Sequence, residues 1–395
     1  MTRPARGARI AALHVANFVG IGVYLPFFPL WLASRSLDAT TIGAILAIPI
    51  VVRVVATAPL LSLLDRGVGV RGLLLAAYGA QVAAYAILGF ADGAAIIAVI
   101  VALTALAQAP AIPATDLVTL EATRRDPRLD YGRIRLWGSV AFLAATVGAG
   151  YLLAAARPDA ILWTLAAAAL GAVLVALSLP RADAAGPAPR PAGGRAARLP
   201  RGLWYVIGAA ACIQGSHAAV YAFGSLHWSA IGFSKPSIGY LWWVGVVLEI
   251  AAFAFLGRRI ASVPVAVAVL ALGGVAALVR AVGLWLSPGF GATLALQGLH
   301  AVTFGTTHLA TMAALSRLAP DGARGRAQGM LGALTAFVSA TATVGSGLVF
   351  RAAGPLVFAA MAPLAALGLA FAVLAWRSLA QPHRDGEGGR TRLPS

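Results

Sequence analysis

Two acidic side chains lie inside long apolar stretches of this 395-residue chain. Of its 13 aspartates and glutamates, only Asp116, within PAIPATDLVTL, and Glu249, within LWWVGVVLEIAAF, are left once those in loops, tails and helix ends are set aside. A carboxylic acid with apolar neighbours holds its proton more tightly than one in water. Both residues are therefore candidates for reversible proton binding, and the alternative for each is a buried structural ion pair.

Two arginines also fall within apolar stretches. Arg53 lies twelve residues before Asp65, about 18 Å along a helix, which is too far for its side chain to reach the helix end. A guanidinium stays charged and binds a carboxylate through two parallel hydrogen bonds. We expect Arg53 to hold an anionic solute or to act on Asp116, the alternative being a static Arg–Asp brace. Arg280 lies nearer the end of its stretch, so its alternative is a side chain that extends to the polar boundary.

Hydrogen-bonding side chains recur in two more apolar stretches. They are Gln214, His217 and Tyr221 in CIQGSHAAVYAFGSLHW, and Gln297, His300 and Thr307 in LQGLHAVTFGTTHLATM. Their spacing places each set near one face of a helix, so both are candidates to line one polar cavity. A single histidine in a helix is usually a hydrogen-bonded structural residue, but several polar groups on one apolar helix favour a binding site.

Tryptophans accompany these polar groups. We expect Trp228 to anchor a helix end at a membrane interface, where indole rings are common. Trp242 and Trp243 lie deeper in their stretch. One of them is a candidate to stack on an aromatic ring of a bound molecule.

Several catalytic and metal-binding patterns are absent from the sequence. It has no Gly-rich loop with a lysine to hold phosphates, no HExxH motif and only one cysteine, Cys212, so it lacks a disulfide framework and a thiolate metal site. Because 60% of its residues are hydrophobic and only 11% are charged, little is left for a soluble catalytic domain. We therefore expect a protein that is not an enzyme and has no cofactor or metal.

The composition indicates a polytopic membrane protein. The mean hydropathy is +0.85, and twelve stretches are apolar enough for spanning helices of about 20 residues. They cover residues 8–33, 40–63, 71–91, 94–118, 133–156, 159–180, 202–228, 236–257, 262–284, 289–316, 325–349 and 355–378. The expected fold is an all-α membrane protein with twelve transmembrane helices: an N-terminal six-helix bundle (1–180), a Pro-, Gly- and Arg-rich cytoplasmic linker (181–201), a C-terminal six-helix bundle (202–380) and a cytoplasmic tail (381–395).

Basic residues are distributed unevenly over the predicted loops. Of the 30 lysines and arginines, 24 lie in the termini and the loops on their side, and only Arg35, Arg157, Lys235 and Arg351 lie in the opposite loops. This asymmetry predicts that both termini are cytoplasmic, in a bacterial inner membrane. It also accounts for the net charge of +17 through contact with anionic lipid headgroups, so nucleic acid is not an expected partner.

The two halves of the chain resemble each other. GRIR at 132–135 and GRAQ at 325–328 are 193 residues apart, and Pro127 and Pro320 have the same offset. A duplicated six-helix unit is typical of transporters whose binding site lies between the halves, near the middle of the membrane. The sequence therefore predicts a solute transporter that works by alternating access.

The segment LLDRGVGVR at 63–71 closes the second predicted span. It resembles the loop motif of the major facilitator superfamily, in which a helix-end aspartate and loop arginines latch neighbouring helices. The resemblance implies a gating role for Asp65, Arg66 and Arg71. The alternative is a capped, solvated helix end.

Three longer motifs resemble the phenylpropionate permease family of that superfamily. They are YGRIRLWGSVAF (131–142), the stretch 216–249 and LQGLHAVTFGTTH (296–308), and YLPFFPLWL (24–32) agrees with them. The resemblance implies proton-coupled uptake, or symport, of a small solute. The namesake substrate of the family is 3-phenylpropionate.

The chain is also distantly similar to lactose permease. Arg135 matches an arginine that contributes to the sugar site of that permease, and Arg280 and His300 match its arginine and histidine of proton coupling. Thr303 stands where that permease has a glutamate, and Glu249 lies one or two turns nearer the cytoplasm than its counterpart. The resemblance therefore does not carry over the route of the proton.

These inferences combine into one functional prediction: a monomeric inner-membrane symporter for a proton and a small aromatic carboxylate. The predicted substrate-binding residues are Arg53, Arg135, Gln214, His217, Tyr221, Trp242, Gln297 and His300. The predicted proton-coupling residues are Asp116, Glu249, His300 and Arg280. The alternatives are proton symport of a nucleoside or sugar, in which Arg53 holds Asp116, and a non-transporting membrane sensor.

Overall fold

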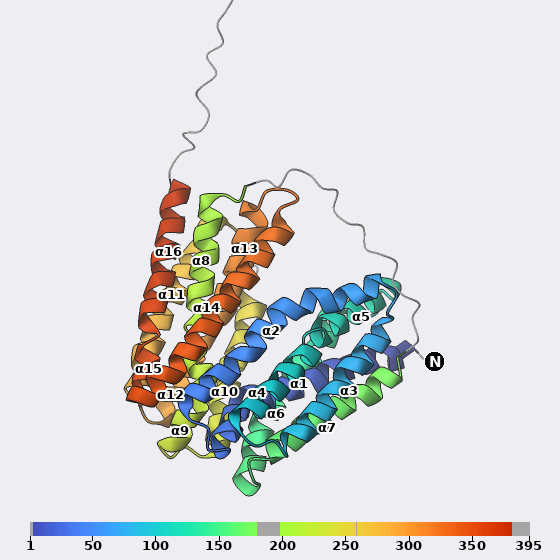
Figure 1. Ribbon diagram of the computed structural model, residues 1–395. Coiled ribbons are helices and arrows are strands. Elements are labelled where there is room, and N and C mark those ends of the chain that lie inside the picture. Colours follow the sequence, from blue (N-terminus) through green and yellow to red (C-terminus); the bar gives the residue numbers. More distant parts are fainter. Residues whose placement is uncertain (1–2, 180–197, 258, 381–395) are drawn as a thin grey trace, which may run out of the picture.

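The structure, a computed structural model, describes residues 3–179, 198–257 and 259–380. Within these ranges all regular structure is helical, and no strand is present (Figure 1). The predicted cytoplasmic tail and most of the predicted linker lie outside the described residues.

The helices form two bundles that follow one another along the chain. The first contains α1 (Arg3–Ser34), α2 (Ala39–Asp65), α3 (Val70–Leu88), α4 (Ala94–Gln108), α5 (Ala111–Arg125), α6 (Tyr131–Ala155) and α7 (Ala160–Leu177). The second contains α8 (Arg201–Gly215), the π-helical η1 (Val220–Gly224), α9 (Ser225–Ala230), α10 (Lys235–Leu256), α11 (Val263–Trp285), α12 (Phe290–Gly298), the π-helical η2 (Ala301–Thr306), α13 (Thr307–Leu318), α14 (Arg324–Ala353), α15 (Leu356–Ala359) and α16 (Ala362–Ala380).

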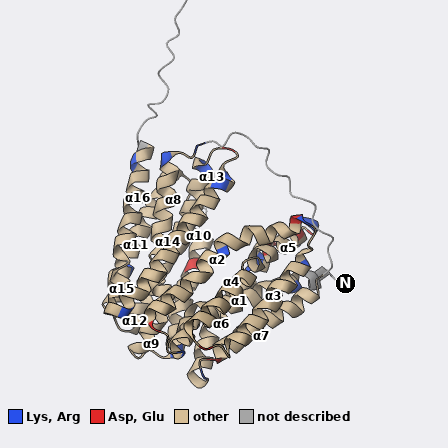
Figure 2. Ribbon diagram, in the orientation of Figure 1, with Lys and Arg blue, Asp and Glu red and all other residues tan. Residues whose placement is uncertain are grey.

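Eleven helices among the described residues are long and apolar enough to cross a membrane, and they coincide with eleven of the twelve predicted spans. The remaining predicted span, 289–316, is divided among α12, η2 and α13, so none of its segments is long enough for a crossing by itself. Figure 2 shows charged residues mainly toward the helix ends, with nearly uncharged stretches between them. The chain is an all-α membrane protein of two six-helix bundles.

Residue types account for several helix boundaries. Asp38, Asp130, Ser234 and Ser262 cap α2, α6, α10 and α11, and each side chain accepts a hydrogen bond from a backbone N–H of the first turn. Pro110 separates α4 from α5 within one predicted span, because proline has no backbone N–H and cannot continue the hydrogen-bonded helix.

The two bundles contact each other mainly through two pairs of helices. Within the first bundle α1 packs along α6 and α7, and within the second α16 packs along α8 and α11. Between the bundles, α2 packs along α14 and α6 along α10. Figure 1 shows the bundles meeting at the end that carries α9, while the ends that carry the N-terminus and the C-terminal end of α16 are spread apart.

Glycines let the bundles touch backbone to backbone at both crossings. A methyl group added at Gly347 of α14 would lie 2.6 Å from the Ala39 carbonyl oxygen of α2. One added at Gly150 of α6 would lie 2.6 Å from the Lys235 carbonyl oxygen of α10. Gly150 and Gly347 occupy similar places in the two halves of the repeat, so both crossings depend on the same small residue.

The expectation for Trp228 is wrong. Only 2% of its surface is exposed, and it lies in the largest apolar core of the molecule. The short helix α9 that carries it packs against α1, and the indole also lies against Gly224, where an added methyl group would be 3.2 Å from the ring. Trp228 therefore stabilises the meeting ends of the bundles from inside and is not an interface anchor.

Candidate functional site

Glu249 and His300 lie at the centre of a polar cluster in the second bundle. Oε2 of Glu249, on α10, is 3.5 Å from Nε2 of His300, and only 16% and 13% of the two side chains are exposed. His300 immediately precedes η2, and π-helical turns are frequent at functional sites. A methyl group added at Gly305 of η2 would lie 2.9 Å from Cγ of Glu249, so the two helices are in close contact here. The structure thus brings together two of the predicted proton-coupling residues.

A hydrogen-bonded chain runs from His217 through Thr303 to Arg280. Nδ1 of His217 lies 3.0 Å from the Gln214 carbonyl oxygen, which can only accept, so Nδ1 carries a proton. Nε2 of His217 lies 2.8 Å from the Thr303 hydroxyl oxygen, and this oxygen accepts from Nη1 of Arg280 at 3.2 Å. Gln214 enters the cluster through its backbone. Thr303, noted in the sequence only as a replacement for a glutamate, joins two predicted site residues.

Each nitrogen of the Arg280 side chain donates a hydrogen bond inside the bundle. Its Nη2 donates to Oε1 of Gln297 at 2.7 Å, and its Nε donates to the Leu296 carbonyl oxygen at 3.0 Å. Gln297 in turn donates to the Leu241 carbonyl oxygen at 3.4 Å. The alternative that Arg280 extends to the polar boundary is wrong: it is only 5% exposed, and a buried guanidinium needs these partners. Arg280 and Gln297 therefore fix the geometry of the cluster.

Aromatic rings form one wall of the cluster. Tyr221 stacks on Trp242, with ring centres 5.8 Å apart, and on His217 at 5.6 Å. The indole N–H of Trp242 donates to Ser225 at 3.0 Å, and Trp242 is buried, whereas 37% of Trp243 is exposed. Of the two tryptophans, Trp242 is the one that belongs to the cluster.

Asp116, in the first bundle, has Tyr131 and Arg135 as its partners. The Tyr131 hydroxyl donates to Oδ1 of Asp116 at 3.1 Å, and Nε of Arg135 lies 4.0 Å from the same oxygen. The guanidinium of Arg135 also lies over the ring of Phe18, 4.1 Å from its centre, in a cation–π contact. The two predicted residues Asp116 and Arg135 thus form one group.

Arg53 does not pair with Asp116. Its Nε donates to the Pro49 carbonyl oxygen at 3.1 Å, one turn earlier in α2. In the described part of the chain no carboxylate lies within ion-pair distance of its guanidinium. The interpretations of Arg53 as a partner or a brace for Asp116 are therefore wrong, because Arg135 takes that place.

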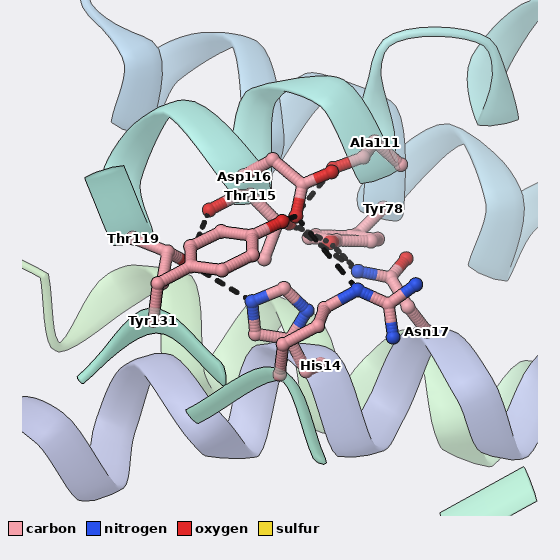
Figure 3. Close-up of polar contacts among 9 residues, drawn as sticks. His14, Asn17, Tyr78, Ala111, Thr115, Asp116, Thr119 and Tyr131 are labelled. Carbon is pink, nitrogen blue, oxygen red and sulfur yellow. Dashed lines mark hydrogen bonds and ion pairs between the residues drawn. The ribbon is translucent and has the colours of Figure 1, made fainter. Parts of the chain in front are cut away.

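A second set of polar side chains surrounds Asp116 and was missed from the sequence. Figure 3 shows His14 and Asn17 of α1 facing Thr115 and Thr119 of α5, with Tyr78 beside them. Asn17 donates to Tyr78 at 2.8 Å, Tyr78 lies 3.1 Å from Thr115, and Nε2 of His14 lies 2.9 Å from Thr119. Polar residues three and four apart in apolar helices were the signal that would have revealed them.

The predicted gating residues Asp65, Arg66 and Arg71 lie where α2 ends and α3 begins. Asp65 and Arg66 are exposed. Among the described residues, neither a hydrogen bond nor an ion pair joins the side chain of any of the three to another residue. Their gating role stays a prediction.

Two bundles, each with a polar cluster among apolar helices, are the architecture expected of a transporter. The sequence model of a family described as "MFS_1 like family" matches residues 8–360. The chain belongs to this family. It is 31% identical over 315 residues to the "Probable 3-phenylpropionic acid transporter" of Escherichia coli (strain K12), a match that covers 77% of this chain and 80% of the relative. This MFS_1 like protein is therefore a membrane transporter of the major facilitator superfamily and not an enzyme.

Solved transporter structures share the fold of this MFS_1 like protein. The crystal structure of the nucleoside transporter NupG (D323A mutant) matches with a TM-score of 0.76 at 13% identity, over 95% of this chain and 99% of that one. A bacterial homologue of the human lysosomal transporter Spinster, in an inward-facing and occupied conformation, matches with a TM-score of 0.70 at 14% identity, over 95% of this chain and 97% of that one. Both matches show the major facilitator fold.

Proposed function

We propose that this transporter takes up a small aromatic carboxylate such as 3-phenylpropionate together with a proton, by alternating access. The observation that carries the proposal is the contact between Glu249 and His300, 3.5 Å apart with only 16% and 13% of the two side chains exposed. The name of the E. coli relative, a probable 3-phenylpropionic acid transporter, supports the choice of solute.

The pair of Glu249 and His300 is suited to bind one proton. A carboxylate and an imidazole at this distance can hold one proton between them, so we assign the proton to the pair and not to either residue alone. Protonation removes a buried negative charge, which lowers the cost of moving the site between the two sides of the membrane. Arg280 would act by holding Thr303 and Gln297 in place beside the pair. Asp116, next to Arg135, is the second proposed proton carrier.

The solute would bind between the bundles. Arg53 and Arg135 supply positive charge on the first bundle for a carboxylate. Tyr221 and Trp242 supply stacked rings on the second bundle for an aromatic group. His300 is a further polar group beside these rings, with its ring centre 6.3 Å from that of Tyr221.

The proposed setting is the bacterial inner membrane, with both termini in the cytoplasm and a monomer as the working unit. The excess of basic residues on the side of the termini supports this orientation. In this orientation the spread ends of the bundles in Figure 1 face the cytoplasm. The solute would therefore leave toward the cytoplasm from the conformation described here.

The test is solute-induced alkalinisation of lightly buffered, de-energised cells that express the protein. The solutes are 3-phenylpropionate, cinnamate, hydroxylated analogues, uridine and lactose, and cells with Glu249→Gln serve as the control. We expect external pH to rise with an aromatic acid in wild-type cells only. A pH that stays constant with every aromatic acid, in cells shown to contain folded protein, would contradict the proposal.

The variant Glu249→Gln also tests the role of the carboxylate. It keeps the shape of the side chain but cannot exchange a proton, so we expect it to abolish accumulation and to retain part of the downhill exchange of labelled solute. Loss of both activities in a normally folded variant would assign Glu249 to solute binding or to structure.

A second candidate is proton symport of a nucleoside or sugar. It is favoured by the hydroxyl and amide groups around Asp116, which suit a solute with many hydroxyls. Alkalinisation by uridine or lactose would support it. A non-transporting sensor, the other alternative, predicts no flux of any solute.

A further inference from the structure

A small cavity lies inside the first bundle, between α1, α2, α3 and α4. Its volume is about 10 Å³, which is room for one water molecule. Its lining includes Tyr24, Phe28, Pro49, Tyr85, Thr104 and Gln108. The cavity is thus too small for an aromatic ring and large enough for one oxygen atom of a polar group.

The polar groups of this cavity have hydrogens to donate. The Tyr85 hydroxyl accepts from Nε2 of Gln108 at 2.6 Å, and within the described ranges its own hydrogen has no acceptor, nor has that of Tyr24. The Thr104 hydroxyl is already used, since it donates to the Ile100 carbonyl oxygen at 2.7 Å. Each of these two phenolic O–H groups can therefore donate to an added hydrogen-bond acceptor.

Arg53 lies beside the cavity and is not neutralised. Its Nε donates to the carbonyl oxygen of Pro49, which lines the cavity, and this contact leaves the two terminal nitrogens free of partners among the described residues. The side chain of Arg53 is exposed, so these terminal nitrogens are accessible to a solute. A positive charge next to two unused donors favours an anionic acceptor.

The second bundle has a corresponding cavity with different chemistry. It is lined by Val220 and Leu284, which lie 196 residues after Tyr24 and Leu88 of the first cavity. Its charged residue is Arg280, all of whose nitrogens have buried acceptors. The fold thus leaves a small void in each bundle. The nitrogens of Arg280 beside the second void already donate to the protein, whereas the terminal nitrogens of Arg53 beside the first donate to none of the described residues.

We propose that this cavity is the carboxylate-binding subsite of the transporter: one carboxylate oxygen of the solute accepts from the hydroxyls of Tyr24 and Tyr85, and the other lies against the guanidinium of Arg53. The inference rests on the proposed function and names the group of the solute that the first bundle recognises. Gln108 is a positioning residue, because it orients the Tyr85 hydroxyl without needing contact with the solute. The subsite selects monocarboxylates over their neutral amides and over nucleosides and sugars.

The test is binding of 3-phenylpropionate and of its neutral amide to the purified full-length protein, measured by calorimetry. The variants Tyr24→Phe and Tyr85→Phe remove only a hydroxyl and keep the ring, including the stack of Tyr24 on Phe28 at 4.4 Å. A hydrogen bond to a charged group contributes about 1.5–3 kcal/mol, so each variant should raise the Kd for the acid about tenfold or more. The amide should bind the wild type more weakly than the acid does, and its Kd should change little in either variant.

The matched control is Tyr205→Phe, the same chemical change on α8 of the second bundle, where the ring packs on Phe371. It should bind the acid like the wild type, and all variants should keep the wild-type denaturation temperature. Unchanged affinity in both Tyr24→Phe and Tyr85→Phe, with wild-type binding intact, would overturn the subsite while the proposed function stands. Wild-type protein that binds none of 3-phenylpropionate, cinnamate, benzoate and lactate would overturn both.

Discussion

Glu249 and His300 are held 3.5 Å apart by two helices that cross at a glycine. Gly305 of η2 lies so close to α10 that an added methyl group would be 2.9 Å from Cγ of Glu249. A methyl group added at Gly245 of α10 would lie 3.2 Å from Cβ of His300. The contact between acid and base is therefore set by backbone packing and not by two freely moving side chains.

Replacement of Gly305 by alanine should separate this pair. The methyl group would force the Glu249 side chain aside, and overpacking of this kind costs about 1–3 kcal/mol. We expect the rate of solute-driven proton uptake to fall roughly tenfold, while uncoupled downhill exchange falls less. Gly291→Ala is the matched control, because nothing lies within 4 Å of a methyl group there. Equal rates of solute-driven proton uptake in Gly305→Ala and Gly291→Ala would contradict the role of the Glu249–His300 pair.

Thr303 should be needed for the stability of the second bundle. Thr303→Val keeps the shape and removes the hydroxyl that joins Nε2 of His217 to Nη1 of Arg280, at a site with 0% exposure. Buried polar groups left without partners cost about 1–3 kcal/mol. We expect a lower denaturation temperature of the purified protein for Thr303→Val and a nearly unchanged one for Thr303→Ser. A wild-type value for the valine variant would show that water replaces the hydroxyl.

The sequence predicted the fold well, because spans of about 20 apolar residues and a repeat of six helices leave few alternatives. It also predicted most members of the cluster around Glu249, since each is a costly polar group in an apolar helix. The pairing of charged residues was harder to predict from the sequence. Arg53 and Arg135 both had the right charge for Asp116, and only the packing of α5 on α6 shows that Arg135 is the partner.

Residues with ordinary local roles were also missed. Thr303 and His14 each look like a single polar residue in an apolar helix, and their function depends on neighbours far away in the chain. The failed expectation for Trp228 has the same origin: a tryptophan near the end of an apolar stretch is compatible with an interface or with a core. Only the packing of α9 on α1 decides between them.

Asp38 should stabilise the start of α2 in a pH-dependent way. The backbone N–H of Thr41, followed by the Thr41 hydroxyl and the backbone N–H of Thr40, donates to its carboxylate and holds the pKa of Asp38 below its usual value. A group with a lowered pKa contributes stability above the pKa of the unfolded chain, about 3.9, and loses that contribution as the pH falls through the folded value.

We therefore expect the denaturation temperature of Asp38→Ala to lie below that of the wild type at pH 7, and the difference to shrink below about pH 4. Asp38→Asn retains an oxygen that accepts the same hydrogen bonds, so its difference from Asp38→Ala should not depend on pH. If the difference in denaturation temperature between the wild type and Asp38→Ala stays constant down to acidic pH, the effect is due to backbone shape alone.

Gly347 should control the closure of the bundles at the end opposite the termini. An added methyl group would lie 2.6 Å from the Ala39 carbonyl oxygen, which is backbone and cannot move aside alone. Overpacking of about 1–3 kcal/mol shifts a two-state equilibrium about 5- to 150-fold. We expect Gly347→Ala to favour the conformation that is open at this end and to slow transport severalfold.

A thiol at position 40 reports on this closure, because the Thr40 hydroxyl is buried against the crossing. In Thr40→Cys protein, labelling by an impermeant maleimide should be slow and should become fast when Gly347→Ala is added; the native Cys212 is buried and gives little background. Gly345→Ala is the matched control, two residues away on the same helix with nothing within 4 Å of the added methyl group. Faster labelling with Gly347→Ala than with Gly345→Ala would show that the closure depends on the contact at Gly347. Equal labelling of the two variants would show that α2 and α14 separate for another reason.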